Sequence, residues 1–505
     1  MGEQQPQLKG PDLTQGVPSV SIVDGALFLG HANGEAVMLA RVDGVCSAVG
    51  ATCTHYSGPL AEGLVVDGTV RCPWHHACFD LRTGAALRPP ALNDLPRWHV
   101  EEHDGRVVVG ARLEIPVAAR RMPQRAPESV GIVGAGAAGQ AAAETLRREG
   151  FAGHITMYDC VESEPVDRPN LSKDYLAGSA QPEWIPLRPA EWHTEHNVEL
   201  VRSEVQAIDA KARRVVAGGR DRAFDRVILA TGAEPIRLSL TGSGPRVLYL
   251  RTLADSDGVI AAAANARRVV VLGASFIGLE VAASLRTRGL DVHVAAPESR
   301  PLERVLGTDL GTFIQALHEE KGVVFHLGRL AKSLDAGHVV LDDGSRLPAD
   351  FVVAGVGVRP RTQLAETAGL RMEKGVLVNE YLETSAPGVF AAGDIARWPD
   401  PHSGAAIRVE HWVVAQRQGQ AAARNAIGAA ERFTAVPFFW SAHYDVSINY
   451  VGHAEKWDRT VVEGSPAQRD CAVRYLSGSK QLAVATIFRD RDSLEVEARM
   501  EGALA

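Results

Sequence analysis

The first hundred residues alternate between short apolar runs and breaks rich in glycine. Runs such as "VSIVDGALFLG", "VMLARVDGVCSAVG" and "RVVVGARL" lie between residues 19 and 110. Alternating apolar and polar positions bounded by turn residues are typical of β-strands. The pattern predicts a small all-β domain over residues 19–110, preceded by a tail over residues 1–18.

A second pattern begins at residue 129 and occurs twice. In "SVGIVGAGAAGQAAAETLRREGFAGHITMYD" an apolar strand ends in a glycine-rich turn, an alanine-rich helix follows, and a second strand ends at Asp159. "RRVVVLGASFIGLEVAASLRTRGLDVHVAA" has the same arrangement. Strands that alternate with helical segments indicate parallel α/β folds. Residues 111–128, "ARLEIPVAARRMPQRAPE", lack periodicity and are interpreted as a linker, which spans about 60 Å when extended.

The composition and charge of the chain argue against several classes of protein. The net charge of -8 and the pI of about 6.1 argue against nucleic acid, because proteins that bind it carry basic faces. No apolar run reaches the roughly 18 residues of a membrane helix, and the start "MGEQQPQLKGPDL" lacks the apolar centre of a secretory signal. Four of the six cysteines lie within residues 46–78. We therefore expect a cytoplasmic protein of about three domains with one local cysteine site.

Two short motifs inside the all-β region carry the chemistry of a metal centre. Cys53 and His55 are spaced C-x-H, Cys72 and His75 are spaced C-x-x-H, and sixteen residues separate the two pairs. Each pair comes from one loop, so two loops can hold a centre from opposite sides. Two thiolates and two imidazoles suit zinc, or a [2Fe–2S] cluster with both histidines on one iron.

The stretch "CTHYSGPLAEGLVVDGTVRCPWHHACFDLRTG" resembles the Rieske family, whose loops read C-x-H and C-P-x-H-G-x-x-F-D. The resemblance implies a [2Fe–2S] cluster with His75 as a ligand, whereas His76 stands where the family usually has glycine. Cysteines that cross-link the loops of high-potential members are replaced here by Gly58 and Trp74. The resemblance is therefore to the ferredoxin-type branch of lower potential.

The first glycine-rich turn has the form of a dinucleotide fingerprint. Its glycines let the backbone approach a pyrophosphate at the helix N-terminus, and an acid twenty residues later can take a ribose hydroxyl. Asp159 and Glu162 are both candidates for that acid. In the second copy Ser275 replaces the middle glycine, and the expected acid is missing. The choice between NADH and NADPH stays open.

Further motifs resemble the putidaredoxin-reductase and apoptosis-inducing-factor-like oxidoreductases. They are "PVDRPNLSKDYL", "GASFIGLE", "GVRPRT", "EHWVVAQRQGQAAA" and "VPFFWSAHYDVSINYVGHAE", within residues 129–455. With a Rieske domain ahead of them, they indicate the Rieske-bearing subgroup of this family. Cys160 has no cysteine near it in the sequence, so a redox disulfide is not expected.

This resemblance implies roles for individual residues. Lys173 is expected to pair with Glu280 beside the flavin N5, and Asp394 to hydrogen-bond the ribityl chain. Trp412 is expected where nicotinamide stacks, with Phe439 and Trp440 on the other side. The full set expected to bind FAD or NAD(P)H is Gly134, Gly136, Ala138, Gly139, Asp159, Arg168, Lys173, Val205, Ala230, Thr231, Gly232, Gly273, Gly278, Glu280, Gly393, Asp394, Glu410, His411 and Trp412.

The expected fold is multidomain: a small all-β Rieske domain, tandem Rossmann-like α/β domains and an α+β interface domain. The FAD domain is placed at residues 129–250 and 383–430, the NAD(P)H domain at 251–382, and the C-terminal domain at 431–505.

The expected function is hydride transfer from NAD(P)H to FAD, followed by single-electron transfer through the tethered cluster to an external acceptor of the oxygenase type. No acid–base residue is nominated as catalytic. The alternatives are a redox-sensing interaction protein and a direct reductase of quinone or another small molecule.

Overall fold

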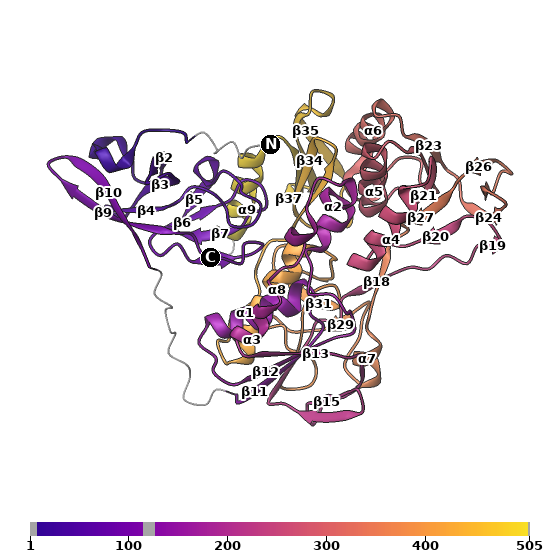
Figure 1. Cartoon of the computed structure of the whole chain (residues 1–505), viewed down its shortest axis with the longest axis horizontal. Helices are drawn as coiled ribbons and strands as arrows, with labels where there is room; N and C mark the ends of the chain where they lie inside the picture. Colours follow the sequence, from indigo (N-terminus) through magenta and orange to yellow (C-terminus); the bar gives the residue numbers. More distant parts are fainter. Residues whose placement is uncertain (1–7, 115–126, 503–505) are drawn as a thin grey trace. The chain divides into compact units, whose positions relative to one another are not determined.

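The computed structural model describes residues 8–114 and 127–502 (Figure 1). These residues form two compact units. The amino-terminal unit contains residues 8–114 together with 489–502, and the reductase unit contains residues 127–488. Among the described residues, no helix combines the length and the apolar content needed to cross a membrane.

Two antiparallel sheets form the body of the amino-terminal unit. The larger has the strand order β1-β10-β9-β4-β3-β2 and the smaller the order β5-β6-β7-β8. Their strands are β1 (Val17–Pro18), β2 (Leu27–Ala32), β3 (Glu35–Val42), β4 (Val45–Gly50), β5 (Leu64–Val66), β6 (Thr69–Arg71), β7 (Cys78–Asp80), β8 (Ala86–Arg88), β9 (Arg97–His103) and β10 (Arg106–Leu113). The all-β character predicted from the alternating pattern is confirmed.

The edges of this unit differ from the sequence expectation. Leu13, in the predicted tail, lies in the short 3₁₀ helix Leu13–Gln15 and is buried beside Trp98 and Val107. Strand β10 also extends to Leu113, inside the predicted linker. The burial of Leu13 in the core explains the first difference, and the pairing of Arg112 with Trp98 and of Leu113 with Arg97 on strand β9 explains the second. Most of the predicted linker, residues 115–126, lies outside the described residues.

The last helix of the chain belongs to the amino-terminal unit. Helix α9 (Asp490–Gly502) packs beside β5, and Figure 1 shows it among the strands of the smaller sheet. The sequence placed this segment in a domain spanning residues 431–505. Charged side chains on α9, described below, explain the difference.

A parallel five-stranded sheet of order β13-β12-β11-β17-β30 forms the first nucleotide fold. Its strands are β11 (Ser129–Val133), β12 (His154–Asp159), β13 (Val198–Arg202), β17 (Arg226–Leu229) and β30 (Val389–Ala391). Helices α1 (Ala137–Arg148) and α8 (Trp412–Ala426) pack closely. A Cβ at Gly419 would lie 2.1 Å from the Ala138 carbonyl, so small residues permit this approach.

Smaller elements accompany this fold. They are the sheet β14 (Val205–Asp209), β15 (Arg214–Ala217) and β16 (Arg220–Ala223), the sheet β29 (Val376–Leu377), β31 (Ala396–Asp400) and β32 (Ala405–Ile407), and the short helices α2 (Asp174–Ala177), α3 (Glu191–Glu195) and α7 (Gln363–Thr367).

The second nucleotide fold repeats the design. Its parallel sheet has the order β20-β27-β21-β22-β23, with β20 (Arg246–Leu248), β21 (Arg268–Leu272), β22 (Asp291–Ala296), β23 (Val324–Leu327) and β27 (Phe351–Ala354). Its helices are α4 (Leu253–Ala263), α5 (Phe276–Thr287) and α6 (Glu303–Glu320). A further sheet contains β19 (Thr241–Gly242), β24 (Ala331–Asp335), β25 (His338–Leu341) and β26 (Arg346–Pro348), and β18 (Ala233–Pro235) pairs with β28 (Val358–Pro360).

An antiparallel sheet of order β33-β34-β37-β36-β35 completes the reductase unit. Its strands are β33 (Phe438–His443), β34 (Val446–Gly452), β35 (Arg459–Ser465), β36 (Asp470–Ser477) and β37 (Lys480–Ile487). Strand β33 packs on helix α5 of the second nucleotide fold and on α8 of the first. It therefore brings its side chains to the place where the two folds meet.

Candidate functional site

The four predicted metal ligands come together in two pairs within the amino-terminal unit. The Nδ1 atoms of His55 and His75 lie 3.2 Å apart, with the two rings nearly perpendicular. Cys53 and Cys72 are both buried and hydrogen-bond each other. That hydrogen bond lowers the pKa of Cys72 and, together with burial, raises the pKa of Cys53. Burial lowers the pKa of His55 to about 3, which leaves its ring neutral and able to donate a lone pair to a metal.

This arrangement fits a centre with two metal atoms. Within residues 8–114 and 127–502, no three His, Cys, Asp or Glu side chains converge on one ion position. Instead, the four side chains form one thiol pair and one imidazole pair. A Rieske cluster needs that division, because thiolates hold one iron and imidazoles the other. The backbone N–H groups of Trp74 and His75 also donate to the Cys72 sulfur, a contact that tunes such clusters.

The loop that carries Cys72 leaves no space at Gly58. A Cβ at this position would lie 2.8 Å from the Cys72 sulfur and 3.3 Å from the Trp74 ring. Positions 58 and 74 are therefore adjacent, as the resemblance implied, but their side chains cannot form a disulfide.

His76 points to helix α9. Its backbone φ of +59° is in the left-handed region that glycine adopts easily, which is the residue that the family usually has here. Its buried ring hydrogen-bonds Glu497 through Nδ1 at 2.8 Å and Ser493 through Nε2 at 3.2 Å. Arg71 lies 3.6 Å from Glu497 and 2.7 Å from Glu501. The C-terminal helix thus holds the residue next to a predicted ligand.

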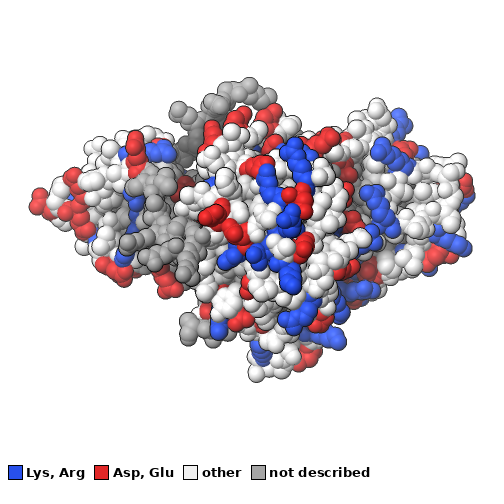
Figure 2. Space-filling model, turned by 90° about the horizontal axis from the view of Figure 1, so that it is seen from below, with Lys and Arg blue, Asp and Glu red and all other residues white. Residues whose placement is uncertain are grey.

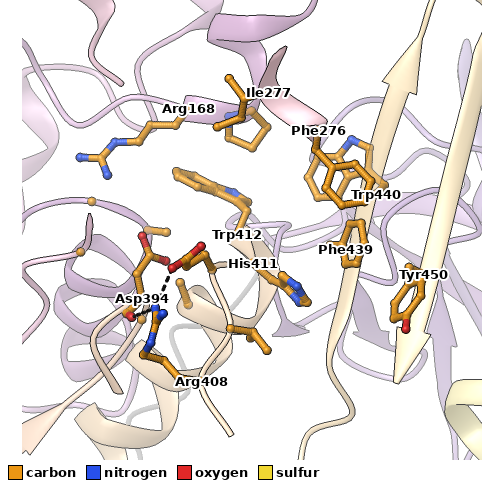
Figure 3. Close-up of a pocket in the computed structure, with 18 of the residues that line it drawn as sticks. Arg168, Phe276, Ile277, Asp394, Arg408, His411, Trp412, Phe439, Trp440 and Tyr450 are labelled. Carbon is orange, nitrogen blue, oxygen red and sulfur yellow. Dashed lines mark hydrogen bonds and ion pairs between the residues drawn. The ribbon is translucent and has the colours of Figure 1, made fainter. Parts of the chain in front are cut away.

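A cavity of about 530 Å³ lies in the reductase unit (Figure 3). Predicted binding residues on its wall are Gly136, Ala138, Arg168, Lys173, Ala230, Gly232, Glu280, Gly393, Asp394, Glu410, His411 and Trp412. Figure 3 shows the Trp412 ring projecting into the space between Arg168 and a group of aromatic side chains, which includes Phe439 and Trp440.

Other predicted residues lie behind this wall. A Cβ at Gly139 would lie 1.8 Å from the Gly134 carbonyl, so these glycines let helix α1 approach its strand. Thr231 donates its hydroxyl hydrogen to the Arg361 carbonyl at 2.7 Å, and Val205 is buried at the start of β14. Asp159 lines a smaller adjoining pocket with Gly136, while Glu162 is exposed. Of the two candidate acids, Asp159 lies at this pocket, and its role in binding ribose stays a prediction.

The cavity wall carries one cation and one polar atom that make no hydrogen bond with the described residues. Arg168 makes no hydrogen bond or ion pair with any described residue, and burial lowers its pKa to about 10, so it stays charged at neutral pH. The His411 Nδ1 atom is buried with no hydrogen-bond partner among the described residues. A cation and an open polar atom on the wall of this cavity suit a bound anionic cofactor such as FAD.

Sequence reasoning missed several lining residues. Arg251 pairs with Asp394 at 2.9 Å and precedes the capping residue of helix α4. Arg408 donates to the Asp394 carbonyl at 2.9 Å and to Glu410 at 2.7 Å. Both arginines hold the loops that carry predicted residues. No local spacing marks them, because their partners are distant in the sequence.

The second glycine-rich turn is intact despite its serine. Ser275 caps helix α5 by accepting from the Gly278 N–H, and its hydroxyl donates to the Gly355 carbonyl at 2.6 Å. Gly273 has a φ of +103°, and a Cβ there would lie 2.5 Å from the Gly355 carbonyl. Arg300, which follows strand β22 of this fold, is paired with Glu303 at 3.0 Å. Ser275 therefore replaces the missing glycine as a helix cap.

Charges on the surface are mixed. Figure 2 shows one face on which Lys and Arg side chains are interspersed with Asp and Glu. This distribution agrees with the net charge of -8 and differs from an extended basic face.

Three family models match the chain. They are the pyridine nucleotide-disulphide oxidoreductase model over residues 128–419, the Rieske [2Fe-2S] domain over residues 17–99 and the reductase C-terminal model over residues 438–501. The last match spans both the β33–β37 sheet and helix α9.

Known proteins resemble the chain over most of its length. Apoptosis-inducing factor 3 of Homo sapiens is 33% identical and covers 90% of this chain and 78% of its own. Putidaredoxin reductase CamA of Pseudomonas putida is 36% identical and covers 72% of this chain and 89% of its own. The covalent putidaredoxin reductase–putidaredoxin complex superposes with a TM-score of 0.72 at 34% identity, and covers 75% of this chain and 94% of the matched chain.

Proposed function

Because the chain belongs to the pyridine nucleotide-disulphide oxidoreductase family and carries a Rieske [2Fe-2S] domain, we propose that it delivers single electrons from NAD(P)H to an external protein. It is a ferredoxin-reductase-like oxidoreductase whose cofactors are FAD, NAD(P)H and a [2Fe–2S] cluster. The proposal adds a route: hydride to FAD, then single electrons through the tethered cluster.

One observation carries the proposal. A single chain contains two loops that each supply one cysteine and one histidine to a predicted metal centre, and it also contains a cavity lined by predicted nucleotide-binding residues. FAD accepts a hydride and gives up one or two electrons, whereas the cluster accepts one. In this proposal Cys53, His55, Cys72 and His75 hold the cluster, and the residues that line the cavity hold FAD.

The residues of the cavity have defined tasks in this proposal. Lys173 lies 2.9 Å from Glu280 and 6.0 Å from the centre of the Trp440 ring. The carboxylate fixes the ammonium at the wall, where the positive charge stabilises negative charge on a reduced cofactor. Arg251 and Arg408 keep the Asp394 loop in place.

We infer the class of electron acceptor from the covalent attachment of the Rieske domain to the reductase. Related reductases include one whose solved complex contains putidaredoxin. A Rieske domain joined to the reductase by the chain supplies a carrier at roughly millimolar effective concentration. The partner is then the protein that consumes electrons from such a carrier, and we propose an oxygenase-type protein. The cytoplasmic location stays a prediction.

Anaerobic titration with NADH and with NADPH tests the route. In the wild-type protein we expect both the flavin and the cluster absorbance to bleach, with the cluster signal appearing in electron paramagnetic resonance. Cys72→Ser should lose the cluster signal and keep the flavin spectrum, which also serves as its control for folding. A cluster that stays oxidised beside reduced flavin would refute the route.

Three further measurements on the same proteins separate the alternatives. A long-lived reduced form with slow turnover would favour the redox-sensing protein. Undiminished quinone reduction by the Cys72→Ser variant would favour direct reduction at the flavin. Zinc in place of iron on metal analysis would overturn the cluster assignment.

A further inference from the structure

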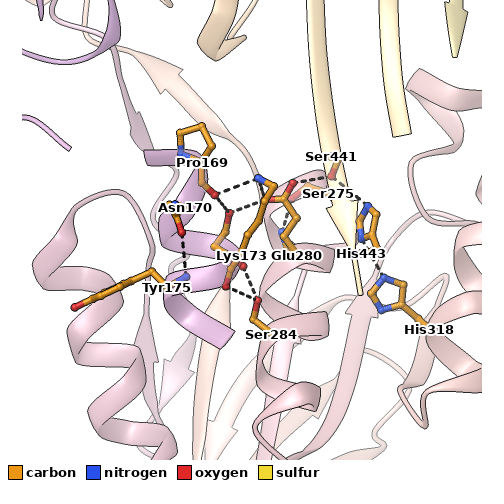
Figure 4. A network of polar contacts seen from close by, with 12 residues as sticks. Pro169, Asn170, Lys173, Tyr175, Ser275, Glu280, Ser284, His318, Ser441 and His443 are labelled. Carbon is orange, nitrogen blue, oxygen red and sulfur yellow. Dashed lines mark hydrogen bonds and ion pairs between the residues drawn. The ribbon is translucent and has the colours of Figure 1, made fainter. Parts of the chain in front are cut away.

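A row of polar side chains leads away from the wall of the cavity (Figure 4). It begins at Glu280 on helix α5, which is 4% exposed. One carboxylate oxygen accepts from Lys173 at 2.9 Å and from Ser172 at 2.5 Å. The other accepts from the Ser441 hydroxyl at 2.6 Å. Glu280 is therefore held from both sides.

The row continues through two buried histidines. The His443 Nε2 atom lies 3.1 Å from the Ser441 hydroxyl oxygen, and its Nδ1 atom lies 3.2 Å from the His318 Nε2 atom. The His318 Nδ1 atom lies 3.3 Å from the Tyr444 hydroxyl. Ser441, His443 and His318 are buried, whereas Tyr444 is partly exposed at the turn between β33 and β34. The row thus connects the cavity wall with the surface.

Both histidines have the protonation state that a relay needs. Burial, with the positive charge of Lys173, lowers the pKa of His443 to about 3. Burial, with His443, also lowers the pKa of His318 well below its ordinary value. Each ring is therefore neutral at physiological pH. A neutral imidazole has one donor and one acceptor nitrogen, so it can gain a proton on one side and lose one on the other.

One assignment of tautomers satisfies every link. With a proton on Nε2 of both histidines, Tyr444 donates to His318, His318 to His443, His443 to Ser441, and Ser441 to the ionised Glu280. When Glu280 is protonated, the reversed set of donors satisfies the same links. The second set holds one proton more than the first, and the loss of one proton from Glu280 through the row to water converts the second set into the first.

The proposed function leaves a proton at the cavity. A hydride carries two electrons and one proton, whereas an iron–sulfur cluster accepts electrons only. Each hydride that leaves as two single electrons therefore leaves one proton, which must reach water. We propose that Glu280, Ser441, His443, His318 and Tyr444 form the exit path for this proton, an inference that rests on the proposed function.

The transfer balances. Glu280 first takes up the proton that the hydride left at the cavity and becomes a carboxylic acid. From there Glu280 gives its proton to Ser441, and Ser441 gives its own to Nε2 of His443. The Nδ1 proton of His443 passes to Nε2 of His318, the Nδ1 proton of His318 to Tyr444, and the Tyr444 proton to water. Five O–H or N–H bonds break, five form, and no electrons move.

The charges at the exit favour release. Burial raises the pKa of Tyr444 above its ordinary value, and the positive charge of Arg286 offsets only part of that rise. The Lys321 ammonium lies 5.8 Å from the centre of the Tyr444 ring. Asp445, the neighbour of Tyr444 in the turn, is paired with Arg469 at 2.7 Å. The nearby cations disfavour a proton resting at the end of the path.

Single-turnover kinetics on the flavin-loaded protein test the path. The variants are Ser441→Ala, its control Ser441→Thr, which keeps the hydroxyl, and Tyr444→Phe, at the partly exposed end. Flavin reduction by NADH under anaerobic conditions should change less than about twofold, because the hydride carries its own proton. Reoxidation by ferricyanide, a one-electron acceptor, is then followed in H2O and D2O, with a pH-indicator dye that reports proton release.

We expect Ser441→Ala and Tyr444→Phe to slow proton release by at least about tenfold and to alter the solvent isotope effect. Ser441→Thr should behave like the wild-type protein. Proton release at the wild-type rate with the wild-type isotope effect in both deletion variants would overturn the path. Ferricyanide takes electrons without the cluster, so delayed proton release in a protein whose cluster stays oxidised would support the path and refute the proposed electron route.

Discussion

Two buried glutamates, one in each unit, hold similar partners in different ways. Glu497 on helix α9 contacts a cation and an imidazole directly, at 3.6 Å from Arg71 and 2.8 Å from His76. Glu280 on helix α5 contacts Lys173 directly but reaches its histidine only through the Ser441 hydroxyl. The Glu497 carboxylate thus lies between two groups that it contacts directly, whereas the Glu280 carboxylate is linked to groups that can exchange protons.

This difference separates a positioning role from a conducting role. A hydroxyl can donate and accept at once, so Ser441 can pass a proton between Glu280 and His443. Glu497 has no such intermediate on the side of His76, and its contacts fix the loop between Cys72 and His75. The predictions below test this distinction through stability and through the two cofactors.

The largest effect is expected from Glu497→Ala. The change leaves the buried His76 without a carboxylate and Arg71 with Glu501 as its remaining carboxylate, and removing one partner of such a buried group costs about 3–5 kcal/mol. The amino-terminal unit should unfold at lower urea, as followed by the visible circular dichroism of the cluster. Glu280→Ala should destabilise the reductase unit by only about 1 kcal/mol, because Lys173 and Ser172 border the cavity and can be hydrated. FAD fluorescence measures that transition.

Glu497→Gln is the control for this pair. Glutamine keeps a hydrogen-bonding oxygen and the shape of the side chain but removes the charge. The stability of Glu497→Gln to urea should therefore lie between that of the wild-type protein and that of Glu497→Ala. Equal losses for Glu497→Ala and Glu280→Ala in their own units would remove the distinction between the two glutamates.

Acid should act on the row that begins at Glu280. The pKa of His443 is lowered to about 3 in the folded protein, against about 6.5 in an unfolded chain. Below pH 6.5 the unfolded chain binds a proton that the folded protein does not, so stability falls as pH decreases from about 6.5 toward 3. The slope is about 1.4 kcal/mol per pH unit for each such histidine.

Urea unfolding at pH 7 and at pH 5, followed by FAD fluorescence, measures this loss. In His443→Asn the free energy of unfolding should depend less steeply on pH, by the contribution of about one histidine. A variant with the wild-type slope would show that His443 takes up its proton in the folded state.

Local motifs explain what the sequence could predict. Metal ligands and glycine turns require fixed spacing, so Cys53, His55, Cys72 and His75 could be found within one stretch, and Gly134 to Gly139 in another. His76 and Glu497 are 421 positions apart, and Glu280 and Ser441 are 161 apart. No periodicity joins such pairs. The partners of helix α9 are also distant in the sequence. Its polar pattern indicates a helix but does not indicate the surface on which the helix packs.

His76→Gly tests whether the contact between His76 and Glu497 only stabilises the fold or is also needed to hold the metal centre. Glycine removes the strain of a side chain at φ +59°, but it leaves Glu497 and Ser493 without the imidazole, for a net loss of about 1–2 kcal/mol. The electron paramagnetic resonance signal of the cluster should persist. His75→Ala, one position away, should abolish it. Loss of the signal in a folded His76→Gly protein would contradict the choice of His75 over His76.

The smallest effect is expected from Glu501→Gln, one turn beyond Glu497 on the same helix. Glu501 bridges Arg71 at 2.7 Å and Arg88 at 2.6 Å, but the Arg88 side chain is 38% exposed. Water screens such a pair, and the glutamine oxygen can still accept from one arginine, so the loss should stay within about 1 kcal/mol. Urea unfolding followed by the cluster signal measures it beside Glu497→Ala. A loss as large as that of Glu497→Ala would place the anchor of helix α9 at its exposed end, and Glu497 would then be one contact among several.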